Sequence, residues 1–190
     1  MKILLTLFVL LFSSSVVAED IRDFQIEGMT LGDSMLEFLT KQQIDNNSLD
    51  YYRIDEFIPV RIEGSYFNSK IYEFIEFNYK SGDENYIIYN VSGMNFPNNI
   101  KKCYKTQKEI MKDVKILFKN VAGVKEDKIT EYIHGADPSG KSTYTRGGFI
   151  FNSGDRISID CNNFSNGNYE MYVSIDAEEF FDFLMSGRAW

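Results

Sequence analysis

The chain has 190 residues, of which 44% are hydrophobic and 15% aromatic, and it carries 20 Lys and Arg against 28 Asp and Glu. This length and composition predict one globular domain with an ample core. The net charge of −8 argues against nucleic acid as a partner, because a polyanion needs a basic face to bind.

Residues 1–18 are predicted to be a cleaved signal peptide. One Lys precedes an apolar run, and small residues, including Val16 and Ala18, stand before the expected cleavage site. The run is too short for a membrane span, so stable membrane insertion is not expected; a retained N-terminal anchor is the alternative. Residues 19–190 would then form a single domain in the periplasm or outside the cell.

The first predicted elements of that domain are a helix and an antiparallel pair of strands. Asp33 or Ser34 can cap the helix, which is expected to end at residues 46–47. Its inner face is Leu31, Met35, Phe38 and Leu39. Because Pro59 interrupts residues 51–68, an edge strand or a loop is expected there. Residues 71–80 alternate as a strand does, and residues 86–91 are expected to return beside it.

Residues 97–121 give the clearest helical pattern in the chain. Asn98 or Asn99 can cap this helix, and no Gly or Pro follows before Gly123. Its apolar positions recur at threes and fours: Ile100, Cys103, Tyr104, Ile110, Met111, Val114, Leu117, Phe118 and Val121. We therefore expect a long central helix with one buried stripe.

The last third of the chain is expected to form a meander and a short helix. Residues 122–128 read as a mobile connector, and residues 129–133 as a short strand or one helical turn. A hairpin of residues 148–151 and 156–161 and a strand of residues 169–175 follow. Residues 176–179 are expected to cap a helix that carries Phe180, Phe181 and Leu184. The fold class predicted is α+β, with an antiparallel sheet packed against the long helix and shorter flanking helices.

Cys103 and Cys161 are the two cysteines, and in an exported chain they are expected to pair. Such a bridge would tie the long helix to a strand. Two separate buried thiols are the alternative, because sequence does not show how closely the two residues approach.

Residues 135–142 match the phosphate-loop pattern G-x-x-x-x-G-K-S letter by letter. A working phosphate loop precedes a helix, whereas T-Y-T-R-G-G-F-I-F favours a strand, so we interpret the segment as a turn-rich loop. Lys141 and Arg146 in this region could still bind a phosphate or sulfate.

No catalytic, cofactor-binding or metal-binding residue is assigned. His134 is the one histidine, which excludes sites built on several histidines, and its place beside a Gly-rich loop is typical of a surface residue. Glu73 and Glu76 fall on opposite faces of their strand, so they do not form an acid and base pair. A turn, rather than a calcium loop, is expected at residues 160–167.

The string I-E-G-M-T-L-G-D-S at residues 26–34 resembles the opening of the outer-membrane assembly lipoprotein and beta-lactamase-inhibitor-protein modules. That resemblance implies helices packed on an antiparallel sheet and a role in binding other proteins, although the lipid-bearing cysteine and the later glycine-proline signature of those modules are missing. The chain as a whole, with C-Y-K and G-K-S-T, resembles uncharacterised short exported proteins of marine alphaproteobacteria.

The function predicted is a non-enzymatic module of the cell envelope that binds a protein partner through aromatic side chains on a rigid sheet. A periplasmic carrier of a small apolar ligand is the alternative, and it would require a dry internal pocket. A hydrolase that uses His134 or clustered carboxylates is a second alternative.

Overall fold

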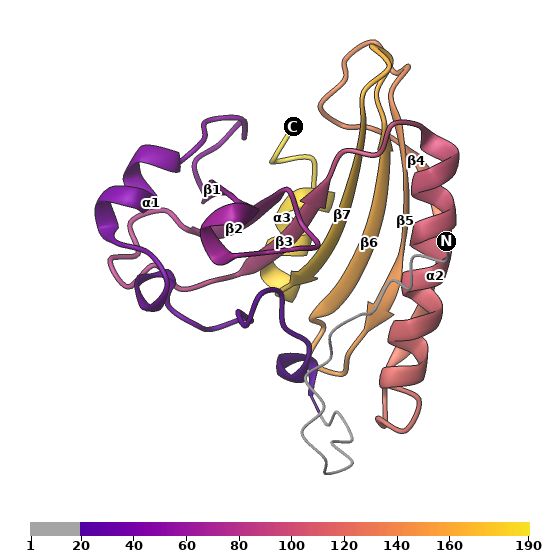
Figure 1. Ribbon diagram of the computed structural model, residues 1–190. Coiled ribbons are helices and arrows are strands. Elements are labelled where there is room, and N and C mark those ends of the chain that lie inside the picture. Colours follow the sequence, from indigo (N-terminus) through magenta and orange to yellow (C-terminus); the bar gives the residue numbers. More distant parts are fainter. Residues whose placement is uncertain (1–19) are drawn as a thin grey trace.

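The computed structural model describes residues 20–190, so the expected signal peptide lies outside the described residues (Figure 1). The described chain has an α+β fold with a seven-stranded antiparallel sheet of order β1-β2-β3-β7-β6-β5-β4. Its strands are β1 (Phe57–Glu63), β2 (Phe74–Lys80), β3 (Asn90–Asn95), β4 (Lys125–Ile133), β5 (Thr143–Ile150), β6 (Arg156–Asn163) and β7 (Tyr169–Asp176). Its α-helices are α1 (Lys41–Asn47), α2 (Ile100–Leu117) and α3 (Glu178–Met185), with 3-10 turns at Ile21–Asp23, Met35–Glu37 and Gly64–Phe67. The predicted fold class and antiparallel sheet are confirmed.

Alternation along the strands gives the sheet two different faces. The apolar face carries Ile75, Phe77, Val91, Phe149, Ile157, Ile159, Cys161, Val173 and Ile175, all buried in the main core. The polar face carries Glu76, Asn78, Asn90, Ser92, Ser158, Asp160, Asn162, Glu170, Ser174 and Asp176. Nine of these ten polar side chains contribute to a row of buried residues rather than to a solvated surface: Glu76, Asn78, Asn90, Ser92, Ser158, Asp160, Asn162, Ser174 and Asp176.

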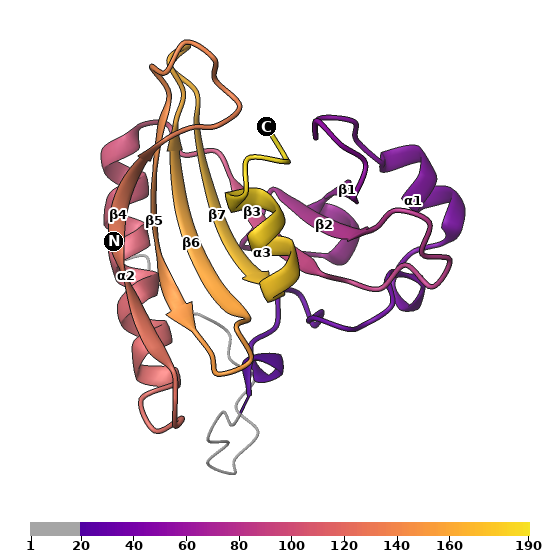
Figure 2. The same ribbon diagram turned by 180° about the vertical axis from the view of Figure 1, so that it is seen from behind.

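Two segments cover the apolar face. Helix α2 packs mainly on β6 and also touches β5 and β7, so it lies over one half of the sheet (Figure 1). Residues 20–49 cover the half built from β1 to β3, and they bury Ile21, Ile26, Met29, Met35, Leu39 and Ile44 in the same core. The polar face is covered in part by α3, which Figure 2 shows on the side of the sheet opposite α2.

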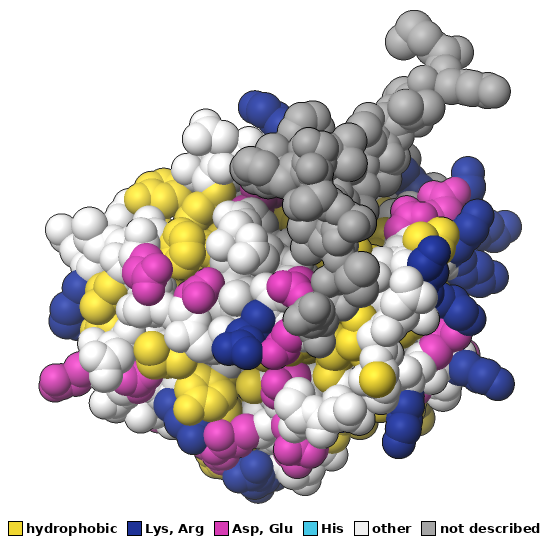
Figure 3. Space-filling view, turned by 90° about the horizontal axis from the view of Figure 1, so that it is seen from below, with side chains coloured by type: hydrophobic (Ala, Val, Ile, Leu, Met, Phe, Trp, Pro, Cys, Tyr) yellow, Lys and Arg dark blue, Asp and Glu magenta, His cyan; other side chains and the backbone are white. Residues whose placement is uncertain are grey.

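Helix α2 is confirmed as an amphipathic helix, and Asn99 caps it by accepting a hydrogen bond from the Lys102 N–H at 2.8 Å. It ends at Leu117 rather than at residue 121. Phe118 leaves the helical conformation, and the Val121 N–H donates to the Phe118 carbonyl in a turn. Its outer surface is basic, with exposed Lys101, Lys102, Lys105, Lys108, Lys112 and Lys115, and in Figure 3 lysine and arginine side chains gather on the side where α2 lies.

The predicted disulfide is confirmed between Cys103 of α2 and Cys161 of β6, with a Cα–Cα distance of 5.9 Å. Next to it, the buried Gln107 side chain donates to the backbone carbonyls of Thr145 and Ile159 at 3.1 and 2.7 Å. One covalent bond and a set of hydrogen bonds therefore fix α2 on the sheet.

The single helix predicted from Ser34 to residue 47 is wrong, because two short elements replace it. Ser34 caps a 3-10 turn, and Thr40 then caps α1 with extended backbone and a reciprocal pair of hydrogen bonds with Gln43. A cap residue needs non-helical backbone, so the cap at Thr40 ends the continuity of the predicted helix.

The boundaries of β2 and β3 also differ from the prediction. Residues 71–73 precede β2, since the Ser69 hydroxyl accepts hydrogen bonds from the N–H groups of Ile71 and Tyr72 in a turn. Residues 86–88 precede β3. Tyr86 has a φ of 52°, and its carbonyl accepts from the Met35 N–H, so this stretch pairs with the N-terminal segment instead of with β2.

The two edge strands were the hardest to predict. β1 is the edge strand considered for residues 51–68, and Pro59 lies within it on the edge of the sheet. β4 confirms the short strand considered for residues 129–133, but it begins at Lys125, within the predicted mobile connector. Its residues are mostly exposed and charged, so they show no alternation of apolar and polar positions.

Helix α3 forms where predicted and its N-cap lies within residues 176–179 as expected, but the cap residue makes no side-chain hydrogen bond to the helix and the inner face differs. Ala177 is the N-cap, and the Glu178 N–H donates to Asp155 at 3.0 Å, while the Asp176 side chain turns to the polar face of the sheet. Phe180 and Phe183 are the fully buried residues of the helix, and they form a second small core with Tyr52, Phe57 and Ala189.

Candidate functional site

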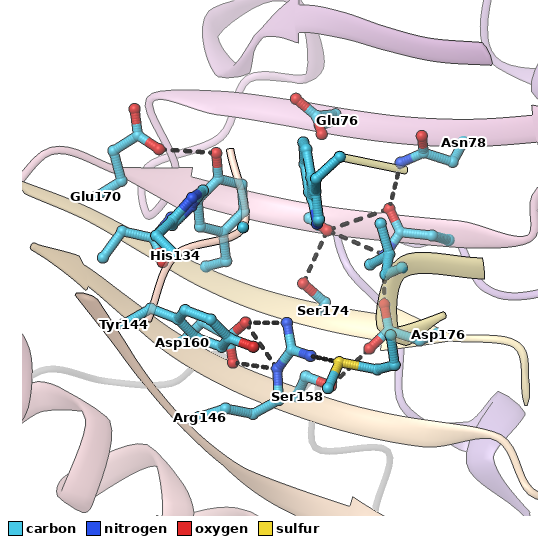
Figure 4. Close-up of a pocket in the computed structure, with 18 of the residues that line it drawn as sticks. Glu76, Asn78, His134, Tyr144, Arg146, Ser158, Asp160, Glu170, Ser174 and Asp176 are labelled. Carbon is cyan, nitrogen blue, oxygen red and sulfur yellow. Dashed lines mark hydrogen bonds and ion pairs between the residues drawn. The ribbon is translucent and has the colours of Figure 1, made fainter. Parts of the chain in front are cut away.

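A cavity of about 570 Å³ lies over the polar face of the sheet. All seven strands contribute to its lining, together with α3, the segment that precedes β1, the loop between β4 and β5 and the C-terminal segment. Figure 4 shows Glu170 and His134 at one end and Asn78 and Asp176 at the other. Its size is that of a site for a small molecule.

The floor of the cavity is a continuous chain of hydrogen bonds across four strands. Asn78 of β2 donates to Asn90 of β3 at 2.8 Å, and Asn90 donates to Asp176 of β7 at 2.6 Å. The Ser158 hydroxyl of β6 donates to the other Asp176 oxygen, and Tyr52 donates to Asn78 at 2.9 Å. These side chains are buried, so the network fixes their orientation.

Asp176 is the carboxyl group at the centre of this chain. Burial raises its pKa above the ordinary value of 3.8, against the opposing effect of the Ser158 hydrogen bond. The floor therefore contains a carboxyl group whose negative charge is disfavoured by its surroundings.

Two arginine–carboxylate pairs flank the floor. Arg61 of β1 contacts Glu76 of β2 through two nitrogens at 2.9 and 2.7 Å, and Tyr51 donates to the other Glu76 oxygen at 2.6 Å. Arg146 of β5 contacts both oxygens of Asp160 of β6, at 3.0 and 2.9 Å through its Nε. Both guanidinium groups are thus already engaged by a carboxylate.

Aromatic rings form the wall at the other end. His134 packs against Phe164 at 5.0 Å, Tyr144 at 5.8 Å and Trp190 at 6.0 Å between ring centroids, and Tyr132 stacks on Tyr144 at 5.2 Å. The Ala136 N–H donates to Nδ1 of His134 at 3.3 Å, and burial lowers the pKa of the imidazole. His134 is therefore a neutral wall residue at pH 7.

Glu170 lies beside this wall, on β7. Its Oε2 accepts a hydrogen bond from the Tyr172 hydroxyl at 2.9 Å, and burial, followed by the charges of Glu76 and Glu170, raises the pKa of Tyr172 well above its usual range. Tyr172 thus stays a neutral donor, and Glu170 brings a carboxylate to the cavity without an arginine against it in the described hydrogen bonds and ion pairs.

The structure separates the two residues of the predicted anion-binding loop. Lys141 is exposed in the loop between β4 and β5, whereas Arg146 lies in the cavity and pairs with Asp160. The phosphate-loop pattern at residues 135–142 is a turn that leads into β5, as the strand-like sequence after it indicated. Asp137 organises that turn by accepting from the N–H groups of Ser139 and Ser142, at 2.8 and 2.9 Å.

Other residues weighed from the sequence fall in different places. His134 is half-buried in the cavity wall rather than on the open surface. Asp160 and Asn162 belong to β6 and line the cavity. Glu76 lines it as well, whereas Glu73 lies before β2 and accepts from the Phe96 N–H at 3.0 Å.

Sequence reasoning missed the floor residues Asn78, Asn90, Ser92, Ser158, Ser174 and Asp176 as a site. Their signal was present, since polar residues occupy every second position in β2, β6 and β7. Such alternation normally describes a solvated face, and only the cover provided by α3 and the C-terminal segment makes this face a cavity.

The described residues contain neither a metal-binding cluster nor a membrane-spanning helix. In residues 20–190, no cluster of three or more His, Cys, Asp or Glu side chains is arranged to hold a metal ion. None of the helices in that range combines the length and the apolar composition that crossing a bilayer requires.

No family model matches the chain, and no curated protein matches it. Among solved structures, it is similar to the solution structure of cyanobacterial PsbP (CyanoP) from Synechocystis sp. PCC 6803, with a TM-score of 0.35 and 10% sequence identity over 70% of this chain and 81% of that chain. At that TM-score the likeness supports no argument about this protein.

Proposed function

We propose that this protein is a non-enzymatic binding protein that holds a small polar ligand in the cavity over its sheet. The observation that carries the proposal is the floor of buried polar side chains, which belong to neighbouring strands and are already oriented by one another. A site with oriented polar groups binds without first ordering its own side chains, which lowers the entropy cost of binding.

The pairing of the carboxylates supports binding rather than catalysis. Glu76 and Asp160 are each held by an arginine, and Asp176 accepts from Asn90 and Ser158. A general base must be within reach of a substrate proton and free to accept it, and these oxygens already accept hydrogen bonds from the protein.

The floor of the cavity, in contrast to its mainly apolar walls, favours a polar ligand over the apolar one considered from the sequence. An apolar ligand would cover the floor groups without offering hydrogen bonds to those with remaining capacity, such as the Ser92 and Ser174 hydroxyls, which share one hydrogen bond of 2.8 Å. Burying polar groups that lack a partner is costly, so a ligand with hydroxyl, amide or amine groups suits this floor.

Export to the periplasm or the extracellular space belongs to the same proposal. The disulfide between Cys103 and Cys161 supports it, because such bonds persist in oxidising compartments. Edman sequencing of protein purified from the cell envelope should begin at Glu19, and a chain that still begins at Met1 in a membrane fraction would contradict cleavage.

The ligand proposal is tested by thermal unfolding in a library of small polar metabolites. A ligand should raise the melting temperature of the wild type. Ser174→Val removes a hydroxyl group from the floor and adds a methyl group to the cavity, so it should abolish that rise. Thr106→Val makes a similar replacement on α2, on the opposite side of the sheet, and should leave the rise intact. A library without any stabilising compound, or a rise unaffected by Ser174→Val, would contradict the proposal.

Protein binding, as predicted from the sequence, is the second candidate, and the edge strand β4 is the observation that favours it. β4 is the end strand of the sheet and exposes Ile129, Tyr132 and Ile133, the last with 68% of its surface accessible. An exposed strand edge can pair with a strand of another protein. Affinity capture from an envelope extract should then recover a partner with the wild type and lose it with Ile133→Lys.

A further inference from the structure

We infer that the ligand of the cavity is an organic ammonium compound, bound between the aromatic wall and Glu170. This inference rests on the proposed function and names the chemical class of its ligand. It combines three observations: the arrangement of the rings, the balance of charge in the cavity and the position of the basic surface of the protein.

The rings supply the first part of a cation site. Tyr132, Tyr144, Phe164 and Trp190 all line the cavity, with His134 in contact with the last three. The Arg146 guanidinium already lies 5.2 Å from the centre of the Tyr144 ring, so Tyr132, Phe164 and Trp190 are the rings considered for a ligand. An aromatic face attracts a cation within about 6 Å of its centre through the negative charge above the ring, and several rings together recognise alkylated ammonium groups. The wall therefore suits a cation that also carries carbon groups.

The charge balance of the cavity supplies the second part. The lining contains four carboxyl groups, Glu76, Asp160, Glu170 and Asp176, against two arginines, Arg61 and Arg146. Each arginine is paired with a carboxylate, so neither is free to attract an anion. Glu170 is the carboxylate next to the wall, and its hydrogen bond from Tyr172 is a neutral one.

Histidine does not reverse this balance. His134 accepts a hydrogen bond at Nδ1 from the Ala136 N–H, so its neutral form carries the hydrogen on Nε2. At pH 7 the ring therefore adds an aromatic surface and a donor, not a positive charge.

The basic surface lies on the other side of the sheet. Helix α2 packs its buried stripe on the apolar face of the sheet and exposes its six lysines to solvent on that side, whereas the cavity opens from the polar face. Cations approaching the cavity thus meet less repulsion than cations approaching α2, and the overall charge of −8 attracts them to the protein.

Calorimetric titration with a matched pair of probes tests the inference. Choline carries a quaternary ammonium group, and 3,3-dimethyl-1-butanol is its uncharged carbon isostere. Choline should bind at least about tenfold more tightly than the isostere, as expected for a cation among aromatic rings. Glucose serves as an uncharged polar probe of the same cavity.

Two substitutions locate the binding. Glu170→Gln should weaken choline binding about tenfold, while the new amide oxygen can still accept from Tyr172. Glu131→Gln is the matched control. It removes the same charge from a residue of β4 that does not line the cavity, so it should leave choline binding unchanged. Tyr132→Leu, on the exposed edge strand, should also weaken choline binding. Circular dichroism of each variant checks that it is folded.

The results separate the inference from the function it rests on. If glucose or the uncharged isostere binds as tightly as choline, or if Glu170→Gln binds choline like the wild type, the ammonium inference is overturned and the polar-ligand proposal stands. If choline, the isostere, glucose and the metabolite library all fail to bind, both are overturned.

Discussion

Asp176 shows how one residue can serve the site at the expense of stability. It lies in the floor of the cavity, with 4% of its surface exposed, and burial raises its pKa. A buried carboxyl group that is held by Asn90 and Ser158 can orient a ligand, but its ionisation costs free energy in these surroundings.

The sign of this effect gives a prediction for Asp176→Asn. Because the folded-state pKa is raised, the stability that Asp176 contributes is present below its ordinary pKa of 3.8 and is lost as pH rises through the folded-state value. The free energy of unfolding of the wild type should therefore fall relative to that of Asp176→Asn as pH rises above 3.8.

Urea unfolding at a series of pH values measures this difference. Asparagine can keep both hydrogen bonds, because its oxygen accepts from Asn90 and its amide can donate to Ser158. Asp182→Asn, at an exposed position of α3, is the control, and its free energy of unfolding should depend on pH as that of the wild type does. If the free energy of unfolding of Asp176→Asn also follows the pH dependence of the wild type, the prediction is contradicted.

The pair of Arg146 and Asp160 gives a second prediction at this scale. Their side chains are 15% and 11% exposed, so Arg146→Met would leave a nearly buried carboxylate without its partner. This variant should lose roughly 3–5 kcal/mol of stability. Arg146→Met combined with Asp160→Leu should recover much of the loss in denaturant unfolding, and a single variant as stable as the wild type would sink the argument.

At the scale of elements, helix α2 and its attachment are the best determined part of the fold. Its apolar spacing and the cap at Asn99 are local properties, so they could be read directly from the sequence. The role of Gln107 could not be read, although it lies one helical turn from Cys103. A polar residue on a helical stripe gives no sign that the carbonyls of Thr145 and Ile159 will meet it.

Gln107→Leu tests the attachment. The substitution removes two hydrogen bonds to backbone carbonyls and leaves the Thr145 hydroxyl without the acceptor it has at 3.0 Å. We expect a loss of about 1–3 kcal/mol in the free energy of unfolding, measured by urea denaturation with the disulfide intact. Gln43→Leu, in the cap of α1, serves as a second variant whose loss of unfolding free energy is compared with that of Gln107→Leu. If Gln107→Leu were more stable than the wild type, the prediction would be contradicted.

The elements that were predicted wrongly share a physical cause. The helix expected after Ser34 is interrupted because the side chain of Thr40 caps a second element, α1, and propensity does not show that Ser34 and Thr40 will both act as caps. Residues 86–88 form a β-like run, yet they pair with residues 33–35, more than fifty positions earlier. Contacts between distant segments decided both cases, and the periodicity of a short window carries no information about them.

At the scale of the whole molecule, the candidate site depends on strand order. β3 lies beside β7, so Asn90 meets Asp176 although 86 positions separate them. Alternation could predict which residues share a face of each strand, but not which strands become neighbours. The disulfide was easier to predict, because two cysteines allow one intramolecular pairing.

The one tryptophan of the chain makes the whole cavity observable. Trp190 lines the cavity and stacks on Tyr51 at 6.4 Å between ring centroids. A bound ligand replaces solvent next to the indole, so its fluorescence emission should shift or be quenched in a saturable titration. Free N-acetyltryptophanamide is the control, and a ligand that binds by calorimetry without changing the emission would place the binding elsewhere.

The strict alternation of β7 has a consequence for how its pairing with β6 is chosen during folding. A slip of one residue would carry Ser174 and Asp176 into the aliphatic core under α2, and would turn Val173 and Ile175 toward Asn90 and Ser158. Both changes raise the free energy of the misaligned β6–β7 hairpin, so it does not compete with the native register. The side chains that line the cavity thus also specify the register of β7. A variant that binds no ligand would still need them for correct strand alignment.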